Sequence, residues 1–251
     1  MTRSAIPVIP LDSCLIATDL HCNGGSQRLI WLNNLLNRCQ ELSASLLILG
    51  DLFDLWCGSE QLGTAEYTGE LEALRKATIS GTEISIIPGN RDFLLGEKFE
   101  SATGVRVHDD AVELRWAGER WHCSHGDLLG TEDRGYQRMR KILRHPITRS
   151  LLSSLPLIIR KGLAGGIRSG SRRSVRKKTK IRMQPDLRMV EGLLAQGYNR
   201  IICGHFHIER KEVVHCAGRK GEFQILEPFE DRGGFLVLHG DDEKFEWWGC
   251  E

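Results

Sequence analysis

The stretch Ser45–Asp54, Ser-Leu-Leu-Ile-Leu-Gly-Asp-Leu-Phe-Asp, predicts a buried strand that ends in a carboxylate. Its apolar run from Leu46 to Leu49 is typical of a strand in a sheet covered on both faces. Gly50 permits a tight turn after this strand, so that Asp51 projects at its carboxyl end. Open α/β sheets carry their chemistry at that edge, although a Gly-Asp pair is also common in ordinary turns.

Helices are expected to separate the first three strands, which are predicted at 14–18, 45–49 and 83–87. Apolar residues after Ser26 fall at helical spacing, and a second helix is expected over 65–80. Strands that alternate with helices predict parallel pairing with right-handed crossovers. The spaced apolar residues of the first helix are Leu29, Leu32, Leu35, Leu36, Cys39 and Leu42.

The pattern changes after Val105. Residues 111–116 and 119–123 alternate around Ala117-Gly118, which predicts a β-hairpin. A helix over 186–196 is expected to precede a strand at 200–203. Later strand-like runs are expected to pair in antiparallel fashion, at 213–216, 222–226, 235–239 and 245–248.

Five of the expected strands end in residues that can bind a metal. On an extended segment, Asp-x-His and His-x-His would each place both side chains on one side of the chain. Carboxylate, imidazole and amide oxygen suit Mn²⁺, Fe²⁺ or Zn²⁺. Seven such candidates are more than one ion needs. Two ions ~3.5 to 4 Å apart fit better, and such a pair activates water for attack on phosphorus. The candidates are Asp19, His21, Asp51, Asn90, His125, His205 and His207.

Each pattern also has an ordinary structural explanation. Asn90 after Pro88-Gly89 could belong to a turn, and Asp127 could cap the segment that follows it. If these explanations were correct, residue types that bind metals would have to occur at all five strand ends by coincidence. A shared metal site is the better explanation. The other histidines are interpreted as surface or core residues: His108, His122, His145, His215 and His239.

Charge is distributed unevenly along the chain. The formal net charge is +1, yet residues 134–185 hold 16 of the 34 Lys and Arg residues and no Asp or Glu. The rest of the chain is therefore strongly acidic, which is unlike a protein that coats nucleic acid. Residues 137–197 also contain no Phe, Trp or Tyr on which bases could stack, so no nucleic acid partner is expected.

Cysteine usage and hydropathy predict a cytoplasmic protein. The eight cysteines include no Cys-x-x-Cys pair and are interpreted as reduced thiols. Pro7 and Pro10 interrupt the N-terminal apolar residues, which argues against a signal peptide. No run of ~18 apolar residues predicts a membrane span.

Together the motifs resemble the calcineurin-like metallophosphoesterases over nearly the whole chain. Two longer stretches resemble, more narrowly, the UDP-2,3-diacylglucosamine hydrolases of lipid A biosynthesis: 89–96, Gly-Asn-Arg-Asp-Phe-Leu-Leu-Gly, and 131–138. The chain departs from that family at Cys57-Gly58-Ser59-Glu60, where family members tend to have an acidic pair, and at 205–209. The shared motifs are Asp19-Leu20-His21, Gly50-Asp51, Asn90-Arg91-Asp92, His125-Gly126-Asp127 and Gly204-His205-Phe206-His207.

The resemblance implies a single α/β domain over 1–251, a four-layer α/β/β/α sandwich with an inserted helical lid at about 133–182. It implies two divalent ions, with Mn²⁺ expected. One would be held by Asp19, His21 and His207, the other by Asn90, His125 and His205, with Asp51 bridging. Catalytic roles are expected for Asp51, Asn90, Arg91 and His125, and substrate contacts for Asn90, Arg91, Asp133, Ser174, Lys177 and His205.

The implied reaction is hydrolysis of the pyrophosphate bond of UDP-2,3-diacylglucosamine to UMP and 2,3-diacylglucosamine 1-phosphate, by attack of water on the uridine-side phosphorus. One alternative is a related phosphodiesterase or nucleotide pyrophosphatase that acts on another anionic substrate. A second alternative is a scaffold without metal, against which the full set of ligand types argues. The sequence indicates no protein partner.

The lid segment is expected to gather the acyl chains and to rest on the anionic cytoplasmic face of the inner membrane, because it combines apolar and basic residues. Arg172, Arg173 and Lys177 are expected to divide between lipid and diphosphate. The alternative is a helical hairpin that packs on the core with a solvated basic face. The apolar residues are Leu151, Leu152, Leu155, Leu157, Ile158, Ile159 and Leu163, and the basic residues around them include Arg149, Arg160, Lys161, Arg168, Arg176 and Arg182.

Overall fold

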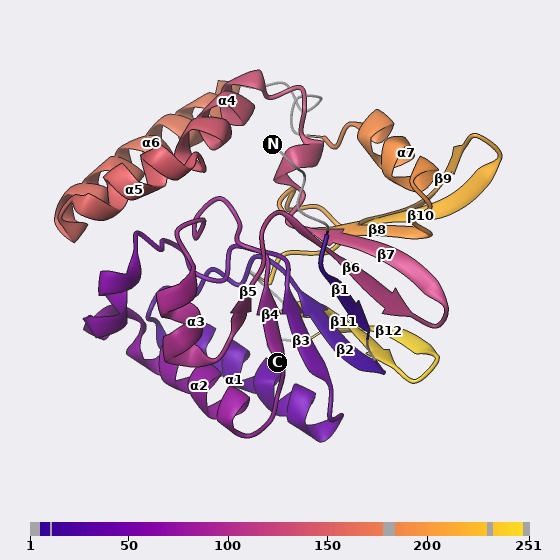
Figure 1. The fold of residues 1–251 in the computed structure, drawn as a ribbon, viewed down its shortest axis with the longest axis horizontal. Helices are drawn as coiled ribbons and strands as arrows, with labels where there is room; N and C mark the ends of the chain where they lie inside the picture. The colour runs from indigo at the N-terminus through magenta and orange to yellow at the C-terminus, as the bar shows by residue number, and fades with distance from the viewer. Residues whose placement is uncertain (1–5, 11, 178–183, 230–232, 248–251) are drawn as a thin grey trace.

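The computed structural model describes residues 6–10, 12–177, 184–229 and 233–247 (Figure 1). Two six-stranded sheets pack face to face, and helices lie on their outer faces. The first sheet has the order β12-β11-β2-β3-β4-β5. Its strands are β2 (Ser13–Ala17), β3 (Ser45–Ile48), β4 (Ile84–Ile86), β5 (Arg106–Val107), β11 (Gly234–His239) and β12 (Asp242–Trp247).

The second sheet has the order β1-β6-β7-β8-β10-β9. Here β6 and β7 form the predicted hairpin, and β8 lies parallel to β7. Because β7 and β8 run side by side in one direction, the residues that follow them meet at the same edge of the sheet. The strands are β1 (Val8–Pro10), β6 (Ala111–Trp116), β7 (Glu119–Ser124), β8 (Arg200–Cys203), β9 (Arg210–Cys216) and β10 (Arg219–Ile225).

Three apolar clusters hold the layers together. In β3, Leu46 and Ile48 pack towards the helices, whereas Leu47 between them packs against the second sheet, as the two-residue period of a strand requires. The helices α1 (Ser26–Glu41), α2 (Thr68–Ile79) and α3 (Glu97–Thr103) cover the first sheet, and α7 (Leu187–Ala195) covers the second. The expected four-layer α/β/β/α sandwich is therefore confirmed.

Three further helices form a separate layer, which we call the α4–α6 layer (Figure 1). It consists of α4 (Arg134–Leu143), α5 (Pro146–Ser154) and α6 (Leu157–Lys177). Asp133 caps α4 by accepting a hydrogen bond from the backbone N of Tyr136, and Pro146 stands in the first turn of α5, where proline is well tolerated. These helices occupy most of the segment expected to be a lid, of which 178–182 lies outside the described residues.

Two expectations about the strands need correction. The C-terminal strands form antiparallel hairpins, β9 with β10 and β11 with β12, but β10 also pairs parallel to β8. The prediction that these strands pair only in antiparallel fashion was therefore wrong. The residue pattern of a strand such as β10 does not show which strand lies on its other side. The short edge strands β1 and β5 were not predicted, since so few residues carry no usable periodicity.

Candidate metal centre and active-site cavity

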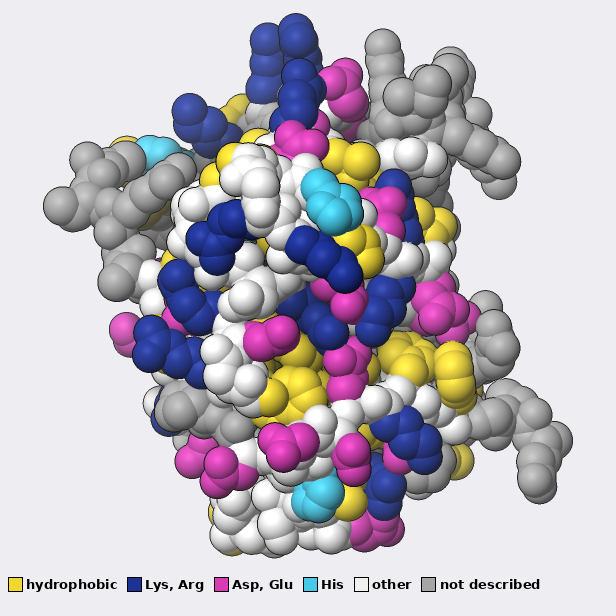
Figure 2. All heavy atoms as spheres, turned by 90° about the vertical axis from the view of Figure 1, so that its right-hand side faces the viewer, with side chains coloured by type: hydrophobic (Ala, Val, Ile, Leu, Met, Phe, Trp, Pro, Cys, Tyr) yellow, Lys and Arg dark blue, Asp and Glu magenta, His cyan; other side chains and the backbone are white. Residues whose placement is uncertain are grey.

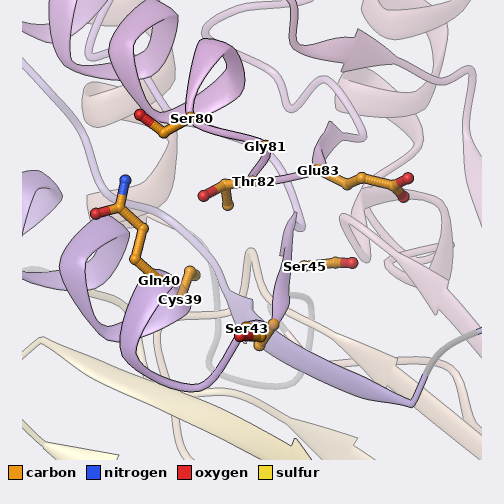
Figure 3. A pocket seen from close by; sticks show the side chains of 9 residues that line it. Cys39, Gln40, Ser43, Ser45, Ser80, Gly81, Thr82 and Glu83 are labelled. Carbon is orange, nitrogen blue, oxygen red and sulfur yellow. The ribbon is translucent and has the colours of Figure 1, made fainter.

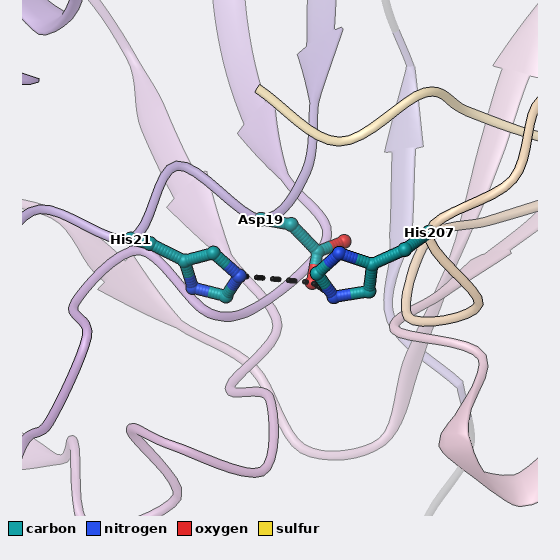
Figure 4. Close-up of side chains that lie close together, drawn as sticks. All are labelled: Asp19, His21 and His207. Carbon is teal, nitrogen blue, oxygen red and sulfur yellow. Dashed lines mark ion pairs between the residues drawn. The ribbon is translucent and has the colours of Figure 1, made fainter. Parts of the chain in front are cut away.

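The first group of candidate ligands consists of Asp19, His21 and His207 (Figure 4). Asp19 and His21 follow β2, and His207 follows β8 in the other sheet. The Nε2 atoms of His21 and His207 lie 3.9 and 3.7 Å from Oδ1 of Asp19. The two imidazole rings are stacked, with centroids 5.6 Å apart.

The Asp19 carboxylate is oriented for an additional ligand. Its Oδ2 accepts hydrogen bonds from Thr18 Oγ1 at 2.6 Å and from the backbone N of His205 at 3.0 Å. Its Oδ1 is buried and accepts no hydrogen bond from the described residues. Burial by itself would raise the pKa of Asp19, but the nearby imidazoles of His125, His207 and His21 outweigh burial. The pKa of Asp19 is therefore below its usual value, and the group is an ionised carboxylate. A buried anionic oxygen between two imidazoles fits a divalent cation.

The second group consists of Asn90, His125 and His205. Asn90 Oδ1 lies 3.2 Å from His125 Nε2 and 3.1 Å from His205 Nδ1, and the two ring nitrogens are 3.1 Å apart. The Nδ1 of His125 lies 2.7 Å from the carbonyl oxygen of Leu49, which requires Nδ1 to donate. In the neutral imidazole, Nε2 then keeps its lone pair for a metal. Burial lowers the pKa of His205 to about 4, which keeps this imidazole neutral as a ligand must be.

Asp51 lies between the two groups. Ligand atoms of Asp19, Asp51 and His125 lie within 4.8 Å of one another. Asp51 Oδ1 accepts a hydrogen bond from the backbone N of Arg91 at 2.9 Å, and Arg91 Nε lies 3.4 Å from Oδ2. Gly50 before it has φ +92°, and a Cβ there would stand 2.4 Å from His125 Nδ1, so glycine is required for this approach.

The backbone around the ligands is unusual. Eight described non-glycine residues have positive φ, and Ser43, Ala117 and Ala217 are three of them. The other five are candidate ligands: Asp19, His21, Asp51, His205 and His207. The expectation that an extended Asp-x-His segment aligns its side chains was therefore wrong, because left-handed residues after the strands bring them together. Such conformations cost of order 1 kcal/mol or more each and concentrate at functional sites.

A cavity of about 600 Å³ opens beside these ligands. Asp51, Asn90, His205 and His207 are among the residues that line it. The α4–α6 layer supplies apolar side chains to the same lining: Met139, Leu143, Leu152, Leu163, Ala164 and Ile167. Arg91 and Asp133, both expected to contact substrate, also line the cavity. The side chains of Arg172, Arg173, Ser174 and Lys177 lie outside the described residues.

The model of the calcineurin-like phosphoesterase family matches residues 13–209, which include every candidate ligand. The chain belongs to this family. Membership makes the protein a hydrolase and implies divalent metal ions, which agrees with the donor set around Asp19. Which residues bind each ion stays a prediction.

Curated relatives narrow the comparison within the calcineurin-like phosphoesterase family. A UDP-2,3-diacylglucosamine hydrolase of Pseudomonas savastanoi pv. phaseolicola is 35% identical over 239 residues, which cover 92% of this chain and 93% of the relative. One from Aromatoleum aromaticum is 34% identical over 233 residues, covering 91% and 94%. Among solved structures, an archaeal phosphodiesterase aligns at 9% identity with a TM-score of 0.46, covering 94% of this chain and 99% of that one.

Asp92 supports the site of this phosphoesterase and was not predicted. It is fully buried, and its carboxylate accepts hydrogen bonds from the backbone N atoms of Leu52, at 2.8 Å, and Gly89, at 2.7 Å. It thus ties the loop of Asp51 to the loop of Asn90. Its place in the Asn90-Arg91-Asp92 motif was the available signal, but the loops that it joins are about 40 residues apart in sequence.

The helix α4 is bound to the same loops. Asp127 accepts hydrogen bonds from Tyr136 Oη at 2.9 Å and from Arg140 Nε at 2.6 Å. Arg144 Nη2 donates to the carbonyl oxygens of Pro88 and Gly89, each at 2.8 Å. Spacing of four residues between Tyr136, Arg140 and Arg144 marks one helix face, and that spacing could have indicated their shared role.

A second, smaller cavity of about 350 Å³ lies at the opposite end of the first sheet (Figure 3). Cys39, Ser45 and Glu83 line it, next to the amino ends of β3 and β4. No cluster of potential metal ligands among the described residues lies there. Because open α/β sheets bind ligands at the carboxyl ends of their strands, the larger cavity is the candidate active site.

Proposed function

We propose that this phosphoesterase hydrolyses the pyrophosphate bond of UDP-2,3-diacylglucosamine, releasing UMP and 2,3-diacylglucosamine 1-phosphate. The observation that carries the proposal is the lining of the large cavity, which combines candidate metal ligands with apolar side chains of the α4–α6 layer. A substrate with a charged diphosphate and two acyl chains needs both kinds of lining. The names of the curated relatives point to the same substrate.

Seven residues would hold the cofactor. We propose that Asp19, His21 and His207 bind one ion, that Asn90, His125 and His205 bind the other, and that Asp51 bridges them. When bound, the two ions supply Lewis acidity to the phosphoryl oxygens and lower the pKa of water. Mn²⁺ is our proposal for the metal, because oxygen and nitrogen donors without thiolate suit it.

Arg91 is proposed to stabilise charge on the phosphoryl oxygens. Its Nη1 donates to Asp54 Oδ1 at 2.5 Å, and its Nε lies 3.4 Å from Asp51 Oδ2, so the guanidinium is held beside the candidate ligands before substrate arrives. Fixed positive charge of this kind needs no reorganisation as the reaction proceeds. Asp133, Arg172, Arg173, Ser174 and Lys177 remain proposed substrate contacts.

The test is release of UMP from UDP-2,3-diacylglucosamine by protein that has been stripped with a chelator and then supplied with Mn²⁺, Mg²⁺ or Zn²⁺ separately. We expect Mn²⁺ to restore the highest rate and Asp51→Asn to lower it by about 10³-fold or more, since the loss removes several kcal/mol of electrostatic stabilisation. In isotopically labelled water, the label should enter UMP.

A related phosphodiesterase or nucleotide pyrophosphatase is the competing function, and UDP-N-acetylglucosamine is the matched control substrate because it lacks the acyl chains. If kcat/KM for it equals or exceeds that for the acylated substrate, the competing function is correct. A rate that chelation leaves unchanged would contradict both.

We propose further that residues 1–251 form one domain in which the α4–α6 layer is a lid, and that its outer surface rests on the anionic cytoplasmic face of the inner membrane. Ile158 is 80% exposed, and Ile147 and Leu151, one helical turn apart in α5, are 65% and 62% exposed. Exposed apolar side chains on a basic segment favour a lipid interface. Among the described residues, no helix could cross a membrane.

A further inference from the structure

Arg160 of α6 is almost fully buried, although it carries a charge. Only 3% of the residue is exposed, and it lines the large cavity next to Trp56 and Cys57 of the loop after β3. A membrane role was expected for this arginine as part of the basic segment, and that expectation is wrong for Arg160, because the side chain is buried and pairs with Glu60. Buried arginines persist only where their donors are satisfied.

The guanidinium of Arg160 joins two segments that are about 100 residues apart in sequence. Nη1 donates to the carbonyl oxygen of Cys57 at 2.7 Å, and Nε donates to the carbonyl oxygen of Leu155 at 2.9 Å. Nη2 donates to Glu60, and this hydrogen bond lowers the pKa of the Glu60 carboxyl. All three nitrogens are therefore used, in the planar arrangement that only arginine provides.

The core loop is shaped to receive this side chain. Gly58 has φ +141°, and a Cβ at this position would stand 2.0 Å from Arg160 Nη1. Any other residue would displace the guanidinium or the loop. The segment Cys57-Gly58-Ser59-Glu60 thus provides a carbonyl, the space and a carboxylate for one arginine.

The ion pair of the next residue, Lys161, is more exposed than the contacts of Arg160. Lys161 Nζ lies 2.5 Å from Glu66 Oε2, but about a third of each side chain is exposed, 35% and 34%. Solvent screens such a pair, and exposed ion pairs contribute little to stability. Lys161 therefore offers a matched control on the same helix.

We propose that Arg160 is a positioning residue that fastens α6 to the loop of Trp56–Glu60 and so keeps the apolar part of the cavity closed for acyl chains. The walls of the cavity there come from both segments: Leu55, Trp56 and Cys57 from the loop, and Leu163, Ala164 and Ile167 from α6. If the fastening is lost, the two walls separate and water enters between them. The role in acyl-chain binding rests on the function proposed above, whereas the fastening itself does not.

The first measurement compares Arg160→Met, which keeps much of the side-chain volume, with wild-type protein. We expect KM for UDP-2,3-diacylglucosamine to rise about tenfold or more while kcat changes less than about threefold, because the contacts made by Arg160 hold a wall of the cavity and not the reacting groups. The ratio of kcat/KM for this substrate to that for bis(p-nitrophenyl) phosphate, a small soluble diester, should fall by about tenfold.

A second variant approaches the same contact from the core. Gly58→Ala leaves Arg160 in place but obstructs it, and should raise KM for the acylated substrate in the same way. In a double-mutant cycle the effects of Gly58→Ala and Arg160→Met should not add, since both remove one interaction. Lys161→Met should leave KM within about twofold of wild type. Arg160→Lys should have a KM between those of wild type and Arg160→Met, because lysine keeps the charge without the planar arrangement of donors.

Backbone amide exchange tests the fastening without any substrate. Amides of 157–167 should exchange faster in Arg160→Met than in Lys161→Met or wild-type protein. Unchanged exchange, or parallel loss of activity on both substrates, would overturn the proposal. If wild-type protein fails to cleave the lipid nucleotide, the proposed function fails, and the exchange comparison still decides whether Arg160 fastens α6.

Discussion

At the scale of single residues, backbone strain is concentrated in the candidate ligands. His207 has φ +52°, a left-handed conformation that disfavours any residue with a Cβ, and the same holds for Asp19, His21, Asp51 and His205. A side chain that could bind a metal is therefore kept at each of these positions against the local preference for glycine. The chemistry of the side chain, and not the stability of the turn, explains its presence.

His207→Gly and His207→Ala separate these two contributions. Both variants should lose metal-dependent activity. In metal-free protein, His207→Gly should be about 0.5–1 kcal/mol more stable than His207→Ala, because only glycine adopts this conformation without strain. Urea unfolding of the two metal-free variants provides the comparison, and an equal or lower stability of the glycine variant would show that φ +52° carries no strain.

A buried histidine away from the metal centre should make stability depend on pH. Burial lowers the pKa of His122 to about 4 from a usual value near 6.5, so the folded state binds fewer protons than the unfolded state between these values. Stability is therefore lost as the pH falls from about 6.5 to about 4. His122→Phe should remove up to about 3 kcal/mol of this loss.

Unfolding free energies at pH 7, 5.5 and 4 check this prediction. The exposed His215 provides the control, since His215→Gln should leave the pH dependence of wild-type protein unchanged. A wild-type and His122→Phe pair with parallel pH profiles would contradict a lowered pKa at His122.

At the scale of elements, α4 is hydrogen-bonded to the loops that carry candidate metal ligands. Arg144 binds the carbonyl oxygens of Pro88 and Gly89, which immediately precede Asn90, and Asp127 binds Tyr136 and Arg140 just after His125-Gly126. The α4–α6 layer is therefore attached to the rest of the protein at two places, through α4 and through α6. The contacts of α4 reach the loops of the candidate ligands, and those of α6 are proposed to hold the apolar wall of the cavity.

Arg144→Met tests the attachment of α4. It removes charged hydrogen bonds to two carbonyl oxygens, each worth about 1.5–3 kcal/mol. We expect a fall in Tm of about 6 °C or more and an approximately tenfold loss of kcat on both the acylated substrate and bis(p-nitrophenyl) phosphate, since Asn90 is displaced for either. This parallel loss distinguishes it from Arg160→Met.

The control for that variant is Arg138→Met, an exposed arginine on the same helix. It should retain both the Tm and the activities of wild-type protein. Should Arg144→Met lower the Tm while leaving kcat unchanged, the contact would stabilise α4 without positioning Asn90.

At the scale of the whole molecule, opposite charges are intermixed on one large face. Figure 2 shows Lys and Arg side chains interspersed with Asp and Glu on the face away from the α4–α6 layer. Ion pairs of this kind include those of Arg200 with Glu243 at 2.5 Å and with Glu222 at 3.2 Å. Such a face has no field of a single sign to attract an anionic polymer, which agrees with our proposal that the acid-free segment 134–185 contacts the anionic surface.

Ile158→Asp tests that surface. Because Ile158 is 80% exposed, the substitution should change the Tm by less than about 2 °C and leave activity on bis(p-nitrophenyl) phosphate intact. Binding to vesicles of phosphatidylglycerol and phosphatidylethanolamine should weaken by about tenfold in a sedimentation assay. Ile79→Asp is the control, since Ile79 is 71% exposed on α2, outside the proposed surface. Equal vesicle binding by both variants and wild type would exclude the α4–α6 layer as the lipid contact.

The sequence by itself determined the strand–helix order, the strand ends that carry the seven candidate ligands, and the family. These are local properties: the apolar run of β3, the glycine after it and the carboxylate of Asp51 are adjacent in the chain, so pattern is enough to recognise them. The choice between a lid that binds lipid and a hairpin packed on the core was not determined in this way, because amphipathic helices serve both roles.

Only the tertiary structure decided how those ends are joined and which charges are free. Left-handed backbone at Asp19 and His207, and not an extended strand, brings two sheets' ligands together. In the sequence, Arg160 looks like one more charged residue of a basic segment. In the structure it is buried against Cys57 and Glu60, which lie about 100 residues away in the chain. Burial and partners depend on segments that meet only after folding, and the pattern within either segment contains no information about the other.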